Sequence, residues 1–246
     1  MRLFALIGYP LKHSFSKKYF SEKFEKENII DCRYELLELP NYQDFPQLLV
    51  AHPNLVGLNV TIPHKQNVIP FLDELDPASA GRIGAVNTIK IEPDGRKIGY
   101  NTDYYGFKTS LEKWLIPFPK PKALVLGNGG AAKAVFAALE DLMIEYQIVS
   151  RQKTDKLITY EDLNEEVLNQ YRLIINTSPV GTFPNVEECP NIAYHLLTDQ
   201  HLLYDLVYNP AETLFLQKGK AQGAATHNGL AMLQLQAEKA WEIWNE

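Results

Sequence analysis

The sequence predicts an α/β protein of two domains, the second of which is built on a parallel β-sheet. Residues 123–138 read as a buried strand, a glycine turn and a helix of small residues. From there to residue 228, short apolar segments alternate with helical segments, which is typical of a parallel sheet with right-handed crossovers. Ahead of this region, three prolines within residues 117–121 form a stiff connector that no helix or central strand can cross.

The composition limits the class of protein. The chain has 246 residues, of which 46% are hydrophobic and 22% charged, as in ordinary soluble globular proteins. Its net charge of −6, without a basic stripe, argues against a nucleic-acid partner. No apolar run approaches the roughly 20 residues that a bilayer requires, and no signal-peptide cleavage pattern is present. Cys32 and Cys189 are far apart and read as free thiols, so we expect a cytoplasmic protein without a membrane partner.

In the first domain, apolar runs bounded by turn residues predict strands. Ser16 is expected to cap a helix that runs toward Glu27. Lys65 is expected at the start of a further helix through Val68 and Leu72. The strands are expected at residues 3–7, 32–39, 55–60, 85–91 and 97–101, the last two as a hairpin, and two more helices at 42–51 and from 76 onward.

The second domain is expected to begin with a helix near Tyr104 that carries Phe107 and Leu111 on its apolar face. Its last element is an amphipathic helix over residues 230–244. Between them, strands are expected at residues 123–126, 147–149, 173–176, 201–206 and 224–226.

The glycine turn of the second domain fits a dinucleotide-binding loop. The spacing from Gly127 through Gly129 to Ala132 matches G-x-G-x-x-A. Gly127 allows the tight turn, Gly129 lets the backbone approach a pyrophosphate, and Ala132 lets the helix pack closely on the strand. The unpaired N–H groups at the helix start favour an anion. Taken alone, this pattern is equally compatible with an ordinary strand–helix turn.

The residues after the second strand of this domain favour NADP over NAD. Domains that bind NAD usually place an acidic residue there, about 20 residues past the glycines, on the ribose 2′-hydroxyl. In this sequence the strand is followed by Ser150, Arg151, Gln152 and Lys153. Arg151 can pair with a 2′-phosphate and Lys153 adds positive charge, although an exposed basic turn would look the same.

Polar side chains follow the predicted strands of the first domain, where open α/β sheets bind ligands. Each has a structural explanation by itself, because Ser16 suits a helix cap, Asn87 a turn and Lys65 a solvated surface. Together they indicate a site for a polyhydroxylated small molecule, with a lysine and an aspartate available for proton transfer. The set comprises Ser14, Ser16, Asn59, Thr61, Lys65, Asn87 and the run Asn101-Thr102-Asp103.

Seven motifs in the same order give the chain a resemblance to the shikimate dehydrogenase family, the shikimate:NADP oxidoreductases of aromatic amino-acid (chorismate) biosynthesis. The resemblance covers nearly the whole chain. The motifs are Gly8-Tyr9-Pro10 to His13-Ser14-x-Ser16, Asn59-Val60-Thr61-Ile62-Pro63-His64-Lys65, Gly84-Ala85-Val86-Asn87-Thr88, Asn101-Thr102-Asp103, Gly127-x-Gly129-Gly130-Ala131, Asn176-Thr177-Ser178-Pro179-Val180-Gly181 and Asn228-Gly229-Leu230-x-Met232-Leu233-x-x-Gln236.

The resemblance implies a fold and a reaction. The fold is an N-terminal α/β substrate domain over residues 1–103, completed by a C-terminal helix at 229–246, and a Rossmann NADP-binding domain over 104–228, with the active site in the cleft between them. The reaction is the reversible, NADPH-dependent reduction of 3-dehydroshikimate to shikimate. The alternatives are a quinate/shikimate dehydrogenase that uses NAD and a ligand-sensing paralogue without catalysis. We expect no metal, and a monomer or homodimer.

The resemblance also assigns roles to residues. Lys65 and Asp103 match the catalytic pair, and Ser14 and Ser16 match the hydroxyls that hold the substrate carboxylate. Two positions depart from the family pattern: Tyr104 replaces the usual glycine after Asn-Thr-Asp, and Tyr100 precedes that motif. The remaining expected substrate residues are Asn59, Thr61, Asn87, Tyr208 and Gln236, and the expected cofactor residues are Gly127, Asn128, Gly129, Gly130, Ala131, Ser150, Arg151, Lys153, Thr177, Gly229 and Met232.

Overall fold

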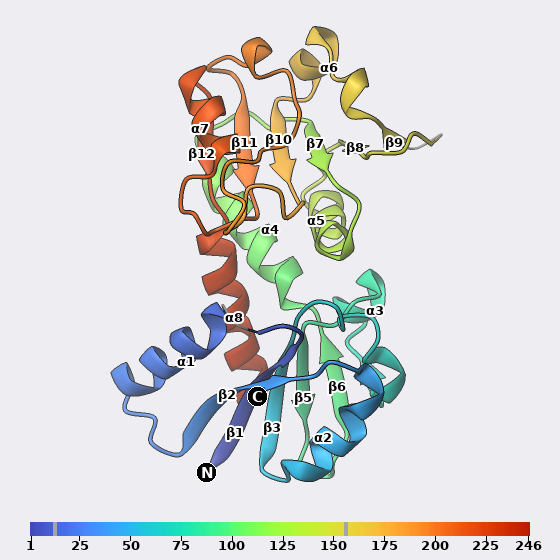
Figure 1. Ribbon diagram of the computed structural model, residues 1–246, viewed down its shortest axis with the longest axis vertical. Helices are drawn as coiled ribbons and strands as arrows, with labels where there is room; N and C mark the ends of the chain where they lie inside the picture. The colour runs from blue at the N-terminus through green and yellow to red at the C-terminus, as the bar shows by residue number, and fades with distance from the viewer. Residues whose placement is uncertain (12–13, 155–156) are drawn as a thin grey trace. The chain divides into compact units, whose positions relative to one another are not determined.

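The computed structural model describes residues 1–11, 14–154 and 157–246 and divides into two compact units (Figure 1). Unit 1 comprises Met1–Thr102 with Ala237–Glu246, and unit 2 comprises Asp103–Gln236. The chain therefore passes between the units twice, each time inside a helix. The first passage lies at the start of α4 (Thr102–Leu115) and the second in the middle of α8 (Leu230–Asn245).

Unit 1 contains a six-stranded mixed sheet in the order β2-β1-β3-β5-β6-β4. The first three strands of that order are mutually parallel, and β5 runs antiparallel to both β3 and β6. The strands are β1 (Arg2–Gly8), β2 (Cys32–Glu38), β3 (Leu55–Val60), β4 (Glu74–Leu75), β5 (Thr88–Ile91) and β6 (Lys97–Tyr100).

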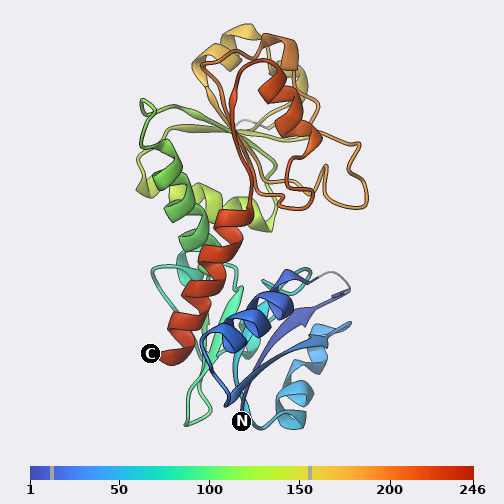
Figure 2. The ribbon, with the colours of Figure 1, turned by 90° about the vertical axis from the view of Figure 1, so that its left-hand side faces the viewer.

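Alternating residues of β1 serve two hydrophobic cores, one on each face of this sheet. Leu3, Ala5 and Ile7 belong to the core that includes Phe45 of α2 (Phe45–Ala51). Phe4 and Leu6 belong to the other core, with α1 (Phe15–Lys26) and the last turns of α8. Figure 2 shows α1 and the end of α8 on the same side of the sheet. The last turns of α8, from Ala237 onward, thus belong to unit 1.

A glycine in β3 explains how closely α8 packs on this sheet. A Cβ atom at Gly57 would lie 2.5 Å from Nε1 of Trp244, so no larger residue fits without displacing the indole. The same Nε1–H donates to the carbonyl oxygen of Ile89 at 3.0 Å. Trp244 is therefore anchored both by packing and by a hydrogen bond.

Unit 2 contains a six-stranded parallel sheet in the order β12-β11-β10-β7-β8-β9. Counted from β7, this is the doubly wound order 3-2-1-4-5-6, in which the winding direction reverses between the first and fourth strands, β7 and β10. The strands are β7 (Ala123–Leu126), β8 (Tyr146–Val149), β9 (Leu157–Ile158), β10 (Leu173–Asn176), β11 (Leu202–Asp205) and β12 (Ala225–His227).

Two layers of helices cover this sheet (Figure 1). Val125 packs in the core with α4 and α5 (Gly130–Asp141). Leu124 and Leu126 pack in the opposite core with α6 (Glu165–Gln170) and α7 (Leu214–Ala221). The continuous apolar run of β7 is therefore buried on both faces, as a central parallel strand should be.

Two of the expectations for local structure are wrong. Helix α1 begins at Phe15, so its N-cap is Ser14 and not Ser16, which lies in the first turn. The segment after Lys65 is a series of turns with one 3₁₀ turn, Ile69–Phe71, and no α-helix. The carbonyl of Lys65 accepts a hydrogen bond from the N–H of Val86 at 2.7 Å instead of from a helical turn, and Pro70 has no N–H to donate.

Several short elements were not anticipated from the sequence. Strands β4 and β9 have two residues each, which is too short for an alternating pattern to be visible. The expected helix from residue 76 is a single turn, α3 (Ala80–Ile83). Within the described residues, no helix is both long and apolar enough to cross a membrane.

Candidate active site

The loops that follow β1 and β3 are joined by backbone hydrogen bonds. The N–H of Tyr9 donates to the carbonyl of Ile62 at 3.1 Å, and the N–H of Thr61 donates to the carbonyl of Ile7 at 2.9 Å. A Cβ atom at Gly8 would lie 2.4 Å from the methyl group of Thr61, so only glycine allows this approach. The expected substrate residues at the ends of these two strands therefore belong to one connected region. His13, in the motif after β1, lies outside the described residues.

The hydroxyl of Ser14 is buried and has no hydrogen-bond partner among the described residues. Ser14 is the N-cap of α1, but its side chain makes no capping hydrogen bond. A buried hydroxyl without a partner is costly in a folded protein and calls for an explanation. A ligand that accepts a hydrogen bond from this hydroxyl would supply one.

Tyr34 of β2 connects two of the expected substrate residues. Its hydroxyl donates to the side-chain oxygen of Asn59 at 2.7 Å and is also hydrogen-bonded to Ser16. Burial raises the pKa of Tyr34, and the Ser16 hydrogen bond acts in the opposite direction. The ring stacks on Phe20, with the two centroids 4.6 Å apart. In the sequence Tyr34 reads as an ordinary core residue of a strand, so it was missed.

The network continues from Asn59 to the start of α4. The Asn59 side-chain amide donates to the hydroxyl of Thr88 at 3.2 Å, which lies 3.1 Å from the hydroxyl of Thr102. The Thr102 N–H donates to the Asn87 side-chain oxygen at 2.7 Å. Ser16, Asn59 and Asn87, which come from three separate segments, are therefore held in one hydrogen-bonded set inside unit 1.

Lys65 lies in a turn, and the residue directly before it, His64, is held in place by a hydrogen bond. The imidazole of His64 is buried, and its Nε2 lies 2.5 Å from the carbonyl oxygen of Leu39. Because a carbonyl oxygen can only accept, Nε2 carries the hydrogen of this bond. Nδ1 has no hydrogen-bond partner among the described residues. Lys65 belongs to unit 1 and Asp103 to unit 2, so their action as a pair stays a prediction.

The glycine loop lies where the winding direction of the unit 2 sheet reverses. Gly127 has φ +113°, and a Cβ atom there would lie 2.9 Å from the hydroxyl oxygen of Thr177. Thr177 follows β10 and donates its hydroxyl hydrogen to the carbonyl of Leu126 at 2.9 Å. Ligands of doubly wound sheets bind at this reversal point, between the loops after the two strands.

Helix α5 begins without a side-chain cap. Its N-cap is Gly129, and Cβ atoms added at Gly129 or Gly130 would meet nothing within 4 Å. The first N–H groups of the helix are therefore not covered by a capping side chain and can donate to phosphate oxygens. The residues present fit the pyrophosphate of a dinucleotide such as NADP. Asn128 and Ala131 are adjacent to these positions in the loop.

Of the residues expected to bind the 2′-phosphate, Arg151 and Lys153 differ in their surroundings. Arg151 is exposed just after β8. Lys153 forms an ion pair with Asp162, at 2.9 Å, and its hydrogen bond is the largest cause that lowers the pKa of Asp162 to about 2. The carboxylate already neutralises Lys153. Ser150, directly before Arg151, accepts a hydrogen bond from Gln152.

Asp205 fixes the loops after β10 and β11. It accepts hydrogen bonds from the Asn176 side chain at 2.9 Å, the Val207 N–H at 3.0 Å and the Thr213 hydroxyl at 2.6 Å. Burial raises its pKa to about 6, although these three hydrogen bonds lower it. The expected substrate residue Tyr208 lies in the second of these loops and is half-buried.

The start of α8 packs closely on α4 and on the end of β11. A Cβ atom at Gly106 would lie 2.5 Å from the carbonyl oxygen of Met232 and 3.0 Å from Cβ of Gln236. A Cβ atom at Gly229 would lie 2.0 Å from the carbonyl oxygen of Leu206. Met232 is buried in the core that α4 shares with the sheet. Gly229, Met232 and Gln236 are therefore positioned by unit 2. In the described part of the chain, no group of three or more His, Cys, Asp or Glu residues could hold a metal ion.

The doubly wound parallel sheet with its uncapped glycine helix, joined to a separate α/β unit, defines a Rossmann-type dinucleotide-binding enzyme. A family model described as the shikimate dehydrogenase substrate binding domain matches residues 6–89. The chain is 39% identical over 259 residues to the shikimate dehydrogenase (NADP(+)) of Carboxydothermus hydrogenoformans, covering 99% of this chain and 91% of that protein. The chain belongs to the shikimate dehydrogenase family.

Two further comparisons support this assignment. The shikimate dehydrogenase (NADP(+)) of Clostridium beijerinckii is 40% identical over 258 residues, which cover 100% of this chain and 93% of that protein. The crystal structure of shikimate 5-dehydrogenase from Thermus thermophilus, in complex with NADP(H) and shikimate, is similar with a TM-score of 0.86 and 32% identity. That match covers 99% of this chain and 93% of the other.

Proposed function

We propose that this protein catalyses the reversible, NADPH-dependent reduction of 3-dehydroshikimate to shikimate in aromatic amino-acid biosynthesis. The observation that carries the proposal is the hydrogen-bonded set of Ser16, Asn59 and Asn87 in unit 1. Its members come from three of the motifs shared with the family. A ring that bears several hydroxyls and a carboxylate requires such a group of oriented donors and acceptors.

On the substrate side, the Ser14 hydroxyl is the clearest single contact. It is buried, unpartnered among the described residues, and belongs to the N-cap of a helix, so it favours an anion such as the substrate carboxylate. Ser16 would contribute a second hydroxyl. Asn59, Thr61 and Asn87 would bind the ring hydroxyls, together with Tyr208 and Gln236 from unit 2.

On the cofactor side, the N–H groups at the start of α5 would hold the pyrophosphate. Arg151 would hold the 2′-phosphate, with Ser150 beside it and a smaller contribution from Lys153 because of its ion pair with Asp162. Thr177, Gly229 and Met232 would border the nicotinamide end of the cofactor.

When bound, NADPH supplies the hydride that reduces the substrate ketone. Lys65 then donates a proton to the developing alkoxide oxygen. Asp103 would accept a hydrogen bond from a substrate hydroxyl and stabilise the ammonium form of Lys65. In the oxidative direction the same residues act in reverse, and Lys65 accepts the proton of the shikimate hydroxyl.

The two alternative functions differ from this proposal, one in the cofactor that it uses and the other in having no catalytic turnover. An enzyme that uses NAD would place an acidic residue after β8, where Ser150 and Arg151 stand. A paralogue that only senses a ligand has no need of both Lys65 and Asp103. The test is to measure NADPH oxidation with 3-dehydroshikimate beside NAD reduction with quinate. We expect turnover in the first assay to exceed the second, and equal or reversed rates would contradict the proposal.

The assignment of functional domains also stays a proposal. We place the substrate domain at residues 1–103 with 229–246, and the NADP-binding domain at 104–228. The contact boundary after Thr102 lies next to the first of these limits, whereas the contact boundary after Gln236 lies inside α8, C-terminal to the second limit. We propose a cytoplasmic enzyme, supported by two free cysteines, acting as a monomer or homodimer.

A further inference from the structure

Tyr104 directly follows Asp103 and makes a side-chain connection between two helices of unit 2. Its hydroxyl donates to the carboxylate of Asp141, the last residue of α5. Lys108, one turn later on α4, donates to the Tyr104 hydroxyl oxygen at 3.3 Å and lies 3.6 Å from the Asp141 carboxylate. Its ammonium group also lies 5.6 Å from the centroid of the Tyr104 ring. These three side chains form what we call the Tyr104 clamp.

The clamp is only partly buried. The side chains of Lys108 and Asp141 are 33% and 28% exposed, and the ring of Tyr104 packs against the core that contains Phe107. Burial raises the pKa of the Tyr104 hydroxyl, and the hydrogen bond to Asp141 raises it further. Tyr104 therefore stays a neutral donor at physiological pH.

The position of the clamp in the chain gives it a consequence for Asp103. Helix α4 begins at Thr102, whose N–H donates to the Asn87 side chain at 2.7 Å in unit 1. Asp103 is the first residue of unit 2. The residue after it, Tyr104, is hydrogen-bonded to Asp141 of α5. The first turn of a helix is where backbone hydrogen bonds are fewest and fraying is easiest. Side-chain contacts must hold that turn in place.

Helical geometry allows Tyr104 to hold the turn without occupying the position of Asp103. Successive residues of an α-helix point about 100° apart around the axis, since there are 3.6 residues per turn. Tyr104 can face α5 while Asp103 faces another direction. A rotation of the first turn would move both side chains together, because Asp103 and Tyr104 are consecutive residues of that turn.

We propose that Tyr104 is a positioning residue for Asp103: through Asp141 and Lys108 it fixes the first turn of α4, and so the carboxylate that acts on the substrate. The inference rests on the proposed function, in which Asp103 contacts the substrate. A displacement of about 1 Å at a catalytic group can cost about 10²-fold in rate, so a loosened turn should cost less than that.

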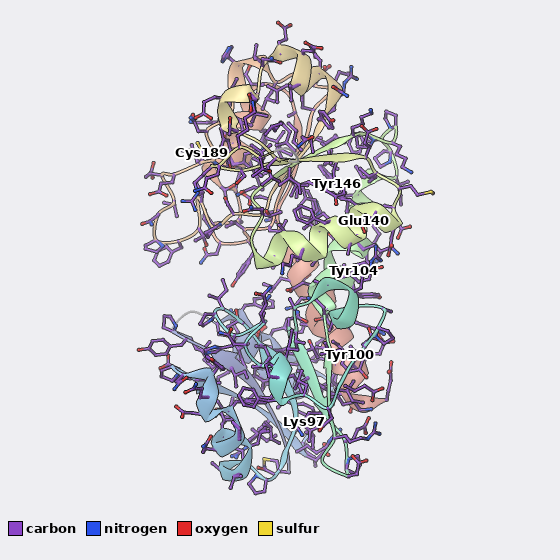
Figure 3. The ribbon with its side chains drawn as sticks, turned by 90° about the vertical axis from the view of Figure 1, so that its right-hand side faces the viewer. Lys97, Tyr100, Tyr104, Glu140, Tyr146 and Cys189 are labelled. Atoms are coloured by element: carbon purple, nitrogen blue, oxygen red, sulfur yellow. The ribbon has the colours of Figure 1, made fainter. Side chains whose placement is uncertain are left out.

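The decisive variants are Tyr104→Phe and Asp141→Ala, with Tyr146→Phe as the matched control. Tyr146 also belongs to unit 2, and its hydroxyl donates to Glu140 of α5 at 3.2 Å (Figure 3). Its ring stacks on Phe136. We expect Tyr104→Phe and Asp141→Ala each to lower kcat about 10-fold, and their combination to lower it no further. Asp141→Asn retains an acceptor for Tyr104 and should recover most of the rate. Tyr146→Phe should leave kcat unchanged.

Amide hydrogen exchange supplies a readout that does not require activity. The N–H groups of Gly106 and Phe107 donate to the carbonyls of Thr102 and Asp103 in α4, so their protection reports the first turn. Tyr104→Phe should lower that protection several-fold, and Tyr146→Phe should not. A kcat within twofold of the wild type, or a loss shared by the control, would overturn the inference, as would unchanged protection. If the wild type does not oxidise shikimate, the proposed function fails, and the exchange experiment still decides whether Tyr104 holds the turn.

Discussion

Tyr34 donates its hydroxyl hydrogen to the side-chain oxygen of Asn59 at 2.7 Å, in the interior of unit 1. This hydrogen bond fixes the orientation of the Asn59 amide, because the amide nitrogen must then face Thr88. Since Ser16 is hydrogen-bonded to the same hydroxyl, a single buried tyrosine aligns two expected substrate residues.

Tyr34→Phe should therefore impair both substrate binding and folding. The variant keeps the ring that stacks on Phe20 and loses only the hydroxyl. We expect a loss of about 1–3 kcal/mol in unfolding free energy, because the buried side-chain oxygen of Asn59 is left without its donor. The KM for shikimate should rise about 10-fold, with little change in the affinity for NADP. Tyr204→Phe is the matched control, since Tyr204 is also buried and its hydroxyl donates to Ser110 in unit 2 at 2.9 Å, so the KM for shikimate should not change.

Ser14→Ala should weaken shikimate binding without a loss of stability. The Ser14 hydroxyl makes no capping hydrogen bond and has no hydrogen-bond partner in the described residues, so its removal breaks no hydrogen bond among them. A hydrogen bond to a charged ligand is worth about 1.5–3 kcal/mol, which corresponds to a KM about 10- to 100-fold higher. Steady-state kinetics and thermal unfolding measure the two effects. An unchanged KM would remove Ser14 from the carboxylate site.

Arg151→Ala should weaken NADPH binding by about 1.5–3 kcal/mol and leave NADH binding nearly unchanged. Only NADPH carries the 2′-phosphate with which the guanidinium would pair. Lys153→Ala serves as the comparison and should have a smaller effect, because Lys153 is already paired with Asp162. Fluorescence titration with both cofactors gives the dissociation constants. Equal losses for NADPH and NADH would mean that Arg151 supports the fold and not the choice of cofactor.

Lys65→Met should lower kcat by about 10²–10⁴-fold, because general acid catalysis acts mainly in the transition state. Shikimate binding, measured by calorimetry, should fall much less. Lys65→Arg should not restore the rate, since a guanidinium does not give up its proton near neutral pH. Lys97→Met is the control: Lys97 lies on β6 of the same unit, pairs with Asp73 and should not affect turnover (Figure 3). A Lys65→Met enzyme with more than a tenth of the wild-type rate would contradict the proton-donor role.

Asp205→Asn should change how stability depends on pH. The pKa of Asp205 is raised from 3.8 to about 6 in the folded protein, so the folded state binds the proton more tightly than the unfolded state. Its contribution is fully present below about pH 4 and is lost as the pH rises through about 6, a change on the order of 2–3 kcal/mol. The Asn variant cannot titrate.

Urea unfolding at pH 4.5 and pH 7.5 measures this effect. The wild type should lose stability relative to Asp205→Asn as the pH rises. The same comparison with Asp199→Asn, which changes an exposed aspartate of unit 2, should show no such difference. A pH-independent difference between the wild type and Asp205→Asn would mean that Asp205 is ionised across this range.

Much of the fold and of the class of site could be read from the sequence, because these depend on local chemistry. The strands over residues 55–60, 123–126 and 173–176 coincide with β3, β7 and β10, since strands in the middle of a sheet are buried on both faces and are therefore mostly apolar. The glycine loop could also be predicted from the sequence, because only glycine adopts the positive φ of Gly127 and leaves room for Thr177 beside it.

Tertiary contacts decided what the sequence could not. Ser16 looked like a helix cap, but its hydroxyl is used by Tyr34, which lies on a strand 18 positions later. The spacing of the apolar residues after Lys65 resembled that of a helix. In the structure, the N–H of Val86 donates to the Lys65 carbonyl, which would accept a hydrogen bond from within the helix if one formed there. Lys153 appeared free for a phosphate until Asp162 was found beside it. Local sequence specifies propensity and periodicity, whereas the partner of each hydrogen-bonding group is set by whichever distant segment the fold brings within about 3 Å of it.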